Sequence, residues 1–129
     1  MLTAVALCLA TNIFFEARGE HLVGKAAIAE VTMNRVASPK YPNNVCDVVW
    51  QRKQFSWTHD GKHDDPTRFK SVFDQQAWSD SKALAVMVLE GEIKFEPTGV
   101  IMYHAEYVTP YWANSYELVY TIGKHKFYK

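Results

Sequence analysis

The sequence predicts an α+β fold with helices in the first two thirds of the chain and a small antiparallel sheet in the last third. Apolar residues recur at helical spacing as far as about residue 90. After Pro97-Thr98-Gly99 the chain changes character and becomes rich in β-branched and aromatic residues. Helices followed by strands, without alternation, are typical of α+β proteins.

Two helices are expected at the start of the chain. The first 17 residues place five apolar side chains on one stripe: Leu2, Val5, Ala6, Leu9 and Ile13. Gly19 is a typical helix stop. Residues 22–36 form the second helix, with Val23, Ala27 and Val31 spaced for one face.

Later elements are also indicated by local pattern. A Pro- and Asn-rich loop precedes a short helix over 47–51, and residues 54–66 are irregular and polar. Residues 68–90 are helical, with a break expected at 78–81 and a stop at Gly91. The second half of this helix should bury four residues: Ala83, Val86, Met87 and Leu89. Strands are expected at three places: 100–104, 116–122 and 125–128.

Composition limits the class of protein. The 129 residues form one domain over 1–129, without repeat or linker, and 48% hydrophobic residues exclude disorder. Zero net charge and the lack of a basic stripe argue against a nucleic-acid partner. We expect a monomer, and we expect the thiols of Cys8 and Cys46 to be free, although a bridge forms if their helices touch.

The apolar beginning of the chain is interpreted as a buried helix. It lacks the basic residues that open a signal peptide and is too short to span a bilayer. We therefore expect neither an encoded secretion signal nor stable membrane insertion.

Glu16 is the first candidate for a catalytic residue, because it lies seven residues after Leu9 on the apolar stripe. A carboxylate in that place is costly unless it is paired, protonated or functional. The end of the helix dipole and the adjacent Phe14 and Phe15 should raise the pKa of Glu16, as a general acid requires. The alternative is a structural ion pair, with Arg35 as the partner within reach.

Common cofactor signatures are absent from the sequence. It contains no paired Cys-x-x-Cys, no HExxH and no glycine-rich phosphate loop, so we expect no cofactor. The run from His59 to Asp65 has neither calcium-loop nor zinc-site spacing. We therefore predict no metal site and place this run at the rim of a cleft.

Seven segments in order carry a resemblance to a known family. They read FEARGE at 15–20, GKAAIAEVTMNRV at 24–36, PNNVCDVV at 42–49, QFSW at 54–57, YHA at 103–105, PYW at 110–112 and GKHKFY at 123–128. Together they resemble the spore-cortex-lytic, SleB-type family of cell-wall hydrolases over nearly the whole chain. The resemblance implies a lysozyme-like catalytic domain that stands alone, as in phage endolysins.

The resemblance also implies an activity. Family members are typically lytic transglycosylases that cleave peptidoglycan between N-acetylmuramic acid and N-acetylglucosamine, with the first Glu of the EARGE motif as catalytic acid. Here that residue is Glu16. Ordinary glycosidases need two carboxylates, whereas a transglycosylase uses the C6 hydroxyl of the substrate and forms a 1,6-anhydro sugar. The implied place of action is the bacterial cell wall, which a phage-encoded enzyme made in the host cytoplasm would reach on release.

Other residues are assigned to substrate binding. Glu20 lines the cleft, orients Glu16 through Arg18, or caps a helix. Several further side chains offer polar or aromatic contacts to a sugar: Gln54, Ser56, Trp57, Tyr103, His104, Trp112 and His125. Trp57 and the two histidines have packing or structural hydrogen bonds as their alternative.

Three rival functions differ in product or in class. A hydrolytic muramidase would use Glu20 or Asp60 to position water, and an amidase would cut the stem peptide instead of the glycan. A non-catalytic cell-wall binding module would keep the fold without needing Glu16.

Overall fold

The computed structural model describes residues 2–51 and 64–129 and confirms the predicted order of helices and strands. The helices are α1 (Ala4–Ala17), α2 (Leu22–Val36), α3 (Val45–Val49), η2 (Pro66–Arg68), α4 (Val72–Leu89) and η3 (Tyr111–Ser115). The strands are β1 (Met102–Ala105), β2 (Leu118–Ile122) and β3 (His125–Tyr128). No helix in these two ranges is both long and apolar enough to cross a membrane.

Helix α1 begins after Thr3, whose hydroxyl accepts a hydrogen bond from the Ala6 amide at 3.1 Å. Leu9 and Ile13 are fully buried, as their spacing predicts. Val5 was wrongly assigned to the buried stripe: the buried face runs through Ala6, Leu9, Ala10 and Ile13, and Val5 lies beside that face, 41% exposed. Leu2 precedes the helix and is half-buried.

Helix α2 has the predicted bounds and packs most of its length against other elements. Of the three residues predicted to share one face, Ala27 and Val31 are buried, whereas Val23 in the first turn is 60% exposed.

Helix α4 is continuous, so the predicted break at 78–81 is wrong. Ser81 is fully buried, and its hydroxyl donates to the carbonyl of Ala77 at 2.7 Å, which satisfies the polar group inside the helix. The buried residues of α4 are Ala77, Ser81, Leu84, Ala85 and Val88. The predicted buried face was therefore misplaced: Ala83 and Met87 are exposed, and Val86 and Leu89 are half-buried.

Gly91 ends α4 as predicted. Its φ of 76° lies in the left-handed region, which glycine adopts without a steric cost. Its amide donates to Val88 O at 3.1 Å, and the next amide donates to Met87 O at 3.0 Å. These two hydrogen bonds satisfy the last carbonyls of the helix.

Helix α3 begins two residues earlier than predicted, because the Asn44 side chain accepts from the Asp47 amide at 2.9 Å. Cys46 on α3 is joined to Cys8 on α1 by a disulfide, with 5.3 Å between their Cα atoms. The expectation of free thiols is therefore wrong. The spacing of two cysteines does not show whether their helices touch, and here they do.

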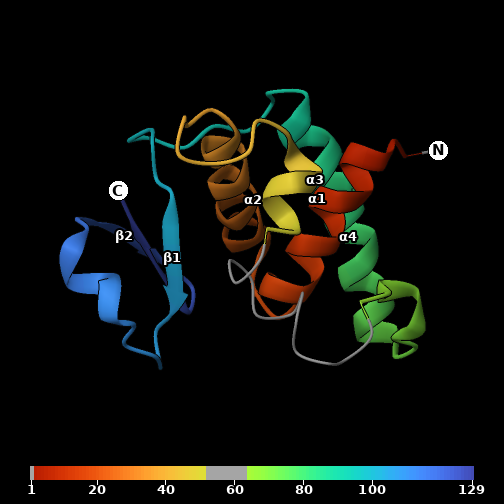
Figure 1. Ribbon diagram of the computed structural model, residues 1–129. Coiled ribbons are helices and arrows are strands. Elements are labelled where there is room, and N and C mark those ends of the chain that lie inside the picture. The colour runs from red at the N-terminus through yellow and green to blue at the C-terminus, as the bar shows by residue number, and fades with distance from the viewer. Residues whose placement is uncertain (1, 52–63) are drawn as a thin grey trace.

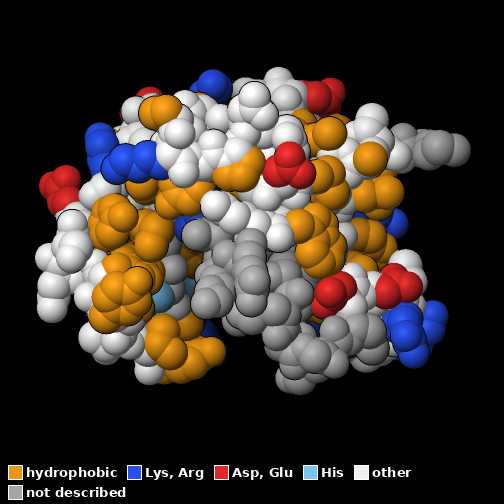
Figure 2. Space-filling view, viewed as in Figure 1, with side chains coloured by type: hydrophobic (Ala, Val, Ile, Leu, Met, Phe, Trp, Pro, Cys, Tyr) orange, Lys and Arg blue, Asp and Glu red, His pale blue; other side chains and the backbone are white. Residues whose placement is uncertain are grey.

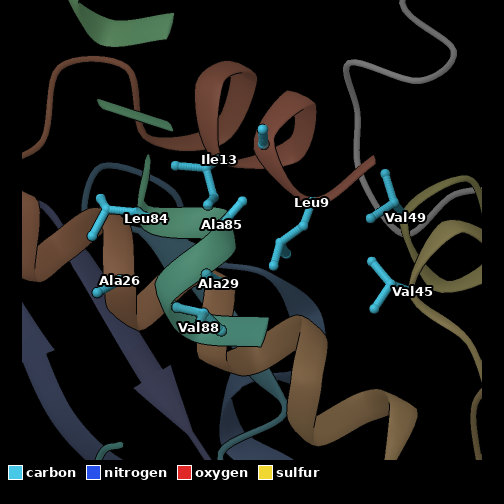
Figure 3. Close-up of a cluster of buried hydrophobic side chains, with 10 residues drawn as sticks. Leu9, Ile13, Ala26, Ala29, Val45, Val49, Leu84, Ala85 and Val88 are labelled. Atoms are coloured by element: carbon cyan, nitrogen blue, oxygen red, sulfur yellow. The ribbon is translucent and has the colours of Figure 1, made fainter. Parts of the chain in front are cut away.

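The four α-helices share one core, shown in Figure 3. Leu9 and Ile13 of α1 lie at its centre with small side chains from α2 and aliphatic side chains from α3 and α4. A second cluster joins α2 to the sheet, where Ile28 and Val31 pack on Val100 and Phe127. Helix α2 consequently lies between the sheet and the other helices (Figure 1).

The sheet is antiparallel with strand order β1-β3-β2. In the pairing of β1 with β3, Tyr103 lies opposite Phe127 and Ala105 lies opposite His125. Because side chains alternate along a strand, these four residues share the face that meets the helices, and His104 points to the opposite face.

Candidate active site

Glu16 lies in the last turn of α1 at the edge of a pocket of about 220 Å³. The pocket is formed where the α1–α2 connection meets one end of the sheet. The described residues that line it are Glu16, Ala17, Gly19, Glu20, Ala105, Tyr107, Lys124 and His125. Glu16 therefore faces an open space large enough to admit part of a ligand.

The pKa of Glu16 is raised from 4.5 to about 7. Burial is the largest cause, because it withdraws the carboxylate from water and so disfavours its charged form. A hydrogen bond from Tyr103 and the positive charge of Arg35 act in the opposite direction but are weaker. The predicted rise is thus confirmed, and Glu16 is partly protonated at neutral pH.

The phenol of Tyr103 connects Glu16 to the helical core. Its hydroxyl interacts with both Glu16 and the fully buried Asn12, which lies one helical turn before Glu16 on α1. The Asn12 amide also reaches the Thr32 hydroxyl on α2, at 3.4 Å. Burial and the nearby Glu16 raise the pKa of Tyr103 well above 10. The phenol therefore stays protonated and can donate a hydrogen bond to Glu16.

Glu20 lines the same pocket and binds the turn between β2 and β3. Its Oε1 accepts from the Lys124 amide and from Nδ1 of His125, both at 2.8 Å. Partial burial opposes ionisation of Glu20, but these hydrogen bonds and nearby histidine charge outweigh it and lower the pKa. Arg18 instead contacts Asp74 of α4 at 3.4 Å and stacks on Phe69.

Two further residues fit closely around Glu20. Gly123 has a φ of 57°, and a Cβ atom there would collide with the Glu20 carboxylate. The buried Lys25 donates from Nζ to the carbonyl of Glu20 at 2.6 Å and to that of Arg18 at 3.2 Å. The positive charge of the Lys25 side chain therefore lies beside carbonyls that follow α1, at the negative end of the helix dipole.

The pocket thus holds two carboxyl groups with opposite pKa shifts. The pKa of Glu16 is raised to about 7, and the pKa of Glu20 is lowered. Such a divergence is the pattern expected of an acid and an ionised partner in one site. Chemically, Glu16 can donate and take back a proton at neutral pH, whereas Glu20 stays charged.

His104 and Trp112 lie together on the other face of the sheet. His104 donates from Nδ1 to Ala105 O and accepts at Nε2 from the Tyr128 hydroxyl, both at 2.7 Å. Trp112 packs edge-on against the rings of His104, Tyr116 and Tyr128, with centroids 5.2–5.9 Å apart. Neither residue is among the described residues that line the pocket. Their substrate-binding role stays a prediction.

Three predicted site residues, Gln54, Ser56 and Trp57, lie outside the described residues, as does the polar run 59–63. Asp65 is described, and its side chain caps η2 by accepting from the Thr67 amide at 3.0 Å. In the described ranges no three His, Cys, Asp or Glu side chains converge as metal ligands.

Sequence reasoning did not single out Asn12, Tyr107 or Lys124. Asn12 had a usable signal, since a polar residue four positions before Glu16 must share its helix face. Lys124 had a signal in its place beside His125 in the GKHKFY segment. Tyr107 had none, because it reaches the pocket only through the pairing of β1 with β3.

Comparisons with solved structures identify similar folds. The catalytic domain of the germination-specific lytic transglycosylase SleB from Bacillus anthracis matches with a TM-score of 0.69 and 26% identity. The match covers 100% of this chain and 97% of that chain. The SleB catalytic domain from Bacillus cereus gives a TM-score of 0.65 at 26% identity, covering 100% and 93%. The predicted lysozyme-like fold is confirmed by these matches.

Sequence comparisons identify spore cortex-lytic enzymes as relatives. The spore cortex-lytic enzyme of Bacillus cereus is 29% identical over 94% of this chain and 42% of its own length. That of Halalkalibacterium halodurans is 32% identical over 92% of this chain and 33% of its own length. The chain therefore spans about a third to two fifths of these relatives. A model of the cell wall hydrolase family matches residues 19–128, so the chain belongs to the cell wall hydrolase family.

Proposed function

We propose that the protein is a peptidoglycan-cleaving glycosidase of the lytic transglycosylase type, with Glu16 as general acid and base. The observation that carries this proposal is the partly desolvated carboxyl of Glu16, with a pKa of about 7, at the edge of an open pocket. The similarity to the SleB catalytic domain supports the same reaction class.

The reaction needs one residue that changes protonation state. Protonated Glu16 donates its proton to the glycosidic oxygen between N-acetylmuramic acid and N-acetylglucosamine. The bond from C1 of the muramic acid to that oxygen breaks, and the leaving oxygen keeps the electron pair. The Glu16 carboxylate then takes the proton of the C6 hydroxyl, whose oxygen bonds to C1 and closes the 1,6-anhydro ring. Glu16 is again protonated at the end.

Neighbouring residues set the pKa and the position of the Glu16 carboxyl for both proton transfers. A pKa of about 7 makes the carboxyl a competent acid and its conjugate a competent base at neutral pH. The Tyr103 hydroxyl interacts with the carboxyl in the free protein and stabilises its ionised form. Tyr103 is therefore a positioning residue in this proposal.

The substrate sets the place of action, which is the bacterial cell wall. A disulfide between Cys8 and Cys46 fits an oxidising location outside the cytoplasm. We also propose that the protein acts as a monomer.

The test is the rate at which purified sacculi are cleared. Glu16→Gln is nearly isosteric and removes the proton donor, so the rate should fall at least about a hundredfold. Glu92→Gln is the matched control, because Glu92 is exposed just after α4 and away from the pocket. Clearance by Glu16→Gln at the parent rate would reject the proposal.

A hydrolytic muramidase is the second candidate, favoured by the ionised Glu20 in the same pocket. In that reaction water attacks C1, and Glu20 would orient it. Digestion in water enriched in oxygen-18 separates the two reactions. A hydrolase incorporates the label at the new reducing end, whereas a transglycosylase releases unlabelled anhydro ends.

A further inference from the structure

We infer that Tyr107 forms a sugar-binding subsite at the mouth of the Glu16 pocket, where its ring stacks on a pyranose of the glycan strand. The inference rests on the proposed function and adds a binding residue to it.

Tyr107 is at once exposed and part of the pocket. Its relative exposure is 84%, yet it lines the pocket together with Glu16 and Glu20. A single exposed aromatic residue is ordinary on a protein surface. One at the edge of a pocket with two carboxyl groups is placed to meet whatever the pocket binds.

The backbone holds Tyr107 in a defined place. The Val108 amide donates to Ala105 O at 3.1 Å, which closes a turn around Tyr107 directly after β1. The Glu106 amide donates to Lys124 O at 2.8 Å, and the Lys124 amide donates to Glu20. The turn that carries Tyr107 is thus tied to the carboxylate segment, so binding a ligand requires little additional ordering of the backbone.

A sugar fits this side chain for a chemical reason. The ring hydrogens of a β-linked pyranose give it flat, weakly polar faces, and its hydroxyls lie around the edge. A tyrosine offers the matching combination of an apolar ring and a polar tip at low entropic cost. In Figure 2 hydrophobic side chains gather over the sheet and η3, and histidine atoms are visible beside them.

Two other aromatic residues of the described ranges, Trp112 and Tyr111, do not combine high exposure with a place in the pocket lining. Trp112 is half-buried, and its ring packs against three aromatic neighbours. Tyr111 is 95% exposed but is not among the described residues that line the pocket. Tyr111 is therefore a matched control for Tyr107.

The experiment compares steady-state kinetics on sacculi for the variants Tyr107→Ala, Tyr107→Phe, Tyr107→Trp and Tyr111→Ala. Loss of one stacking contact should raise KM roughly five- to tenfold for Tyr107→Ala, with kcat within about twofold of the parent. Phe and Trp at this position should restore the parent KM, since they keep the flat ring. Tyr111→Ala should leave both constants unchanged.

Binding is then measured directly by calorimetry. The probe is the tetramer of N-acetylglucosamine, titrated into the Glu16→Gln variant with and without Tyr107→Ala, and the affinity should fall by the same factor. Parent-like KM and affinity in Tyr107→Ala, or an equal loss in Tyr111→Ala, would overturn the subsite. Parent-rate clearance by Glu16→Gln rejects the catalytic proposal instead, so the two failures are distinguishable.

Discussion

At the scale of single residues, the chemistry depends on how Glu16 is kept partly protonated. Burial raises its pKa to about 7, and Tyr103 and Arg35 limit the rise. Arg35 donates from Nε to Ile101 O at 2.8 Å, so its charge is held in place by the segment that leads into β1. The pKa of Glu16 therefore depends on contacts from both the helices and the sheet.

This balance predicts the pH dependence of catalysis. Since the acid must be protonated, kcat/KM should fall as the pH rises through about 7. Tyr103→Phe removes a hydrogen bond that lowers the pKa of Glu16, so the alkaline limb should move to higher pH. Initial rates on sacculi between pH 5 and 9 measure this shift. An unchanged limb, or one moved to lower pH, would contradict the assigned role of Tyr103.

The same pKa predicts a stability effect. The unfolded-state pKa of Glu16 is near 4.5 and the folded-state value is about 7, so ionisation destabilises the fold progressively between these two values. Glu16→Gln avoids that cost. Its unfolding free energy should exceed that of the parent by about 1–3 kcal/mol at pH 8, with the difference shrinking toward pH 5. Urea unfolding at both pH values measures the difference, and a constant difference would contradict this prediction.

Part of the site was open to prediction at the residue scale. The helical period placed Glu16 beside the core and gave the direction of its pKa shift. Tyr103 and His104 were both assigned to substrate binding, although neighbours in a strand face opposite ways. Applying the period of two would have placed only one of them on the face that meets the helices.

At the scale of elements, the turn between β2 and β3 is held by Glu20 and leaves no room for a side chain at Gly123. Gly123→Ala introduces both left-handed strain and a collision with the Glu20 carboxylate, so it should cost about 2–4 kcal/mol of unfolding free energy and reduce activity. Gly91→Ala is the control, because its φ is also positive but its Cβ meets nothing within 4 Å. Urea denaturation should show the smaller loss, about 1–2 kcal/mol, for the control. Equal losses of unfolding free energy in the two variants would show that the collision with Glu20 does not contribute.

The disulfide is the other stabilising feature at this scale. It closes a separation of 38 residues between α1 and α3, and cross-links of this length typically contribute about 2–4 kcal/mol. The double variant Cys8→Ser/Cys46→Ser should lose stability by that amount in urea denaturation. Dithiothreitol should destabilise the parent to a similar extent and leave the variant unaffected. Sensitivity of the variant to dithiothreitol would show that the loss has another cause.

Sequence patterns predicted where the helices begin and end better than which of their faces are buried. The bounds of α2 and the stop at Gly91 follow from local chemistry, and the structure confirms them. A break in α4 was predicted at 78–81, but the helix is continuous there and Ser81 satisfies its hydroxyl within it. Which side of α4 is buried depends on where α1 and α2 lie, and local periodicity contains no such information.

At the scale of the whole molecule, the pocket exists because two layers meet. Helix α1 and the α1–α2 connection supply Glu16 and Glu20, whereas the sheet supplies Ala105 and His125. The contact between Glu20 and His125 joins residues 105 positions apart in the chain. Local patterns do not predict such pairings, although family resemblance correctly indicated the fold in which they arise.

The most direct test of the central claim is mass spectrometry of the muropeptides that the parent and Glu16→Gln release from purified sacculi. The claim is that Glu16 alone moves the proton in both bond breaking and ring closure. The parent should release fragments with 1,6-anhydro ends, and Glu16→Gln should release almost none over the same time. Anhydro ends formed by Glu16→Gln at the parent rate would contradict the account.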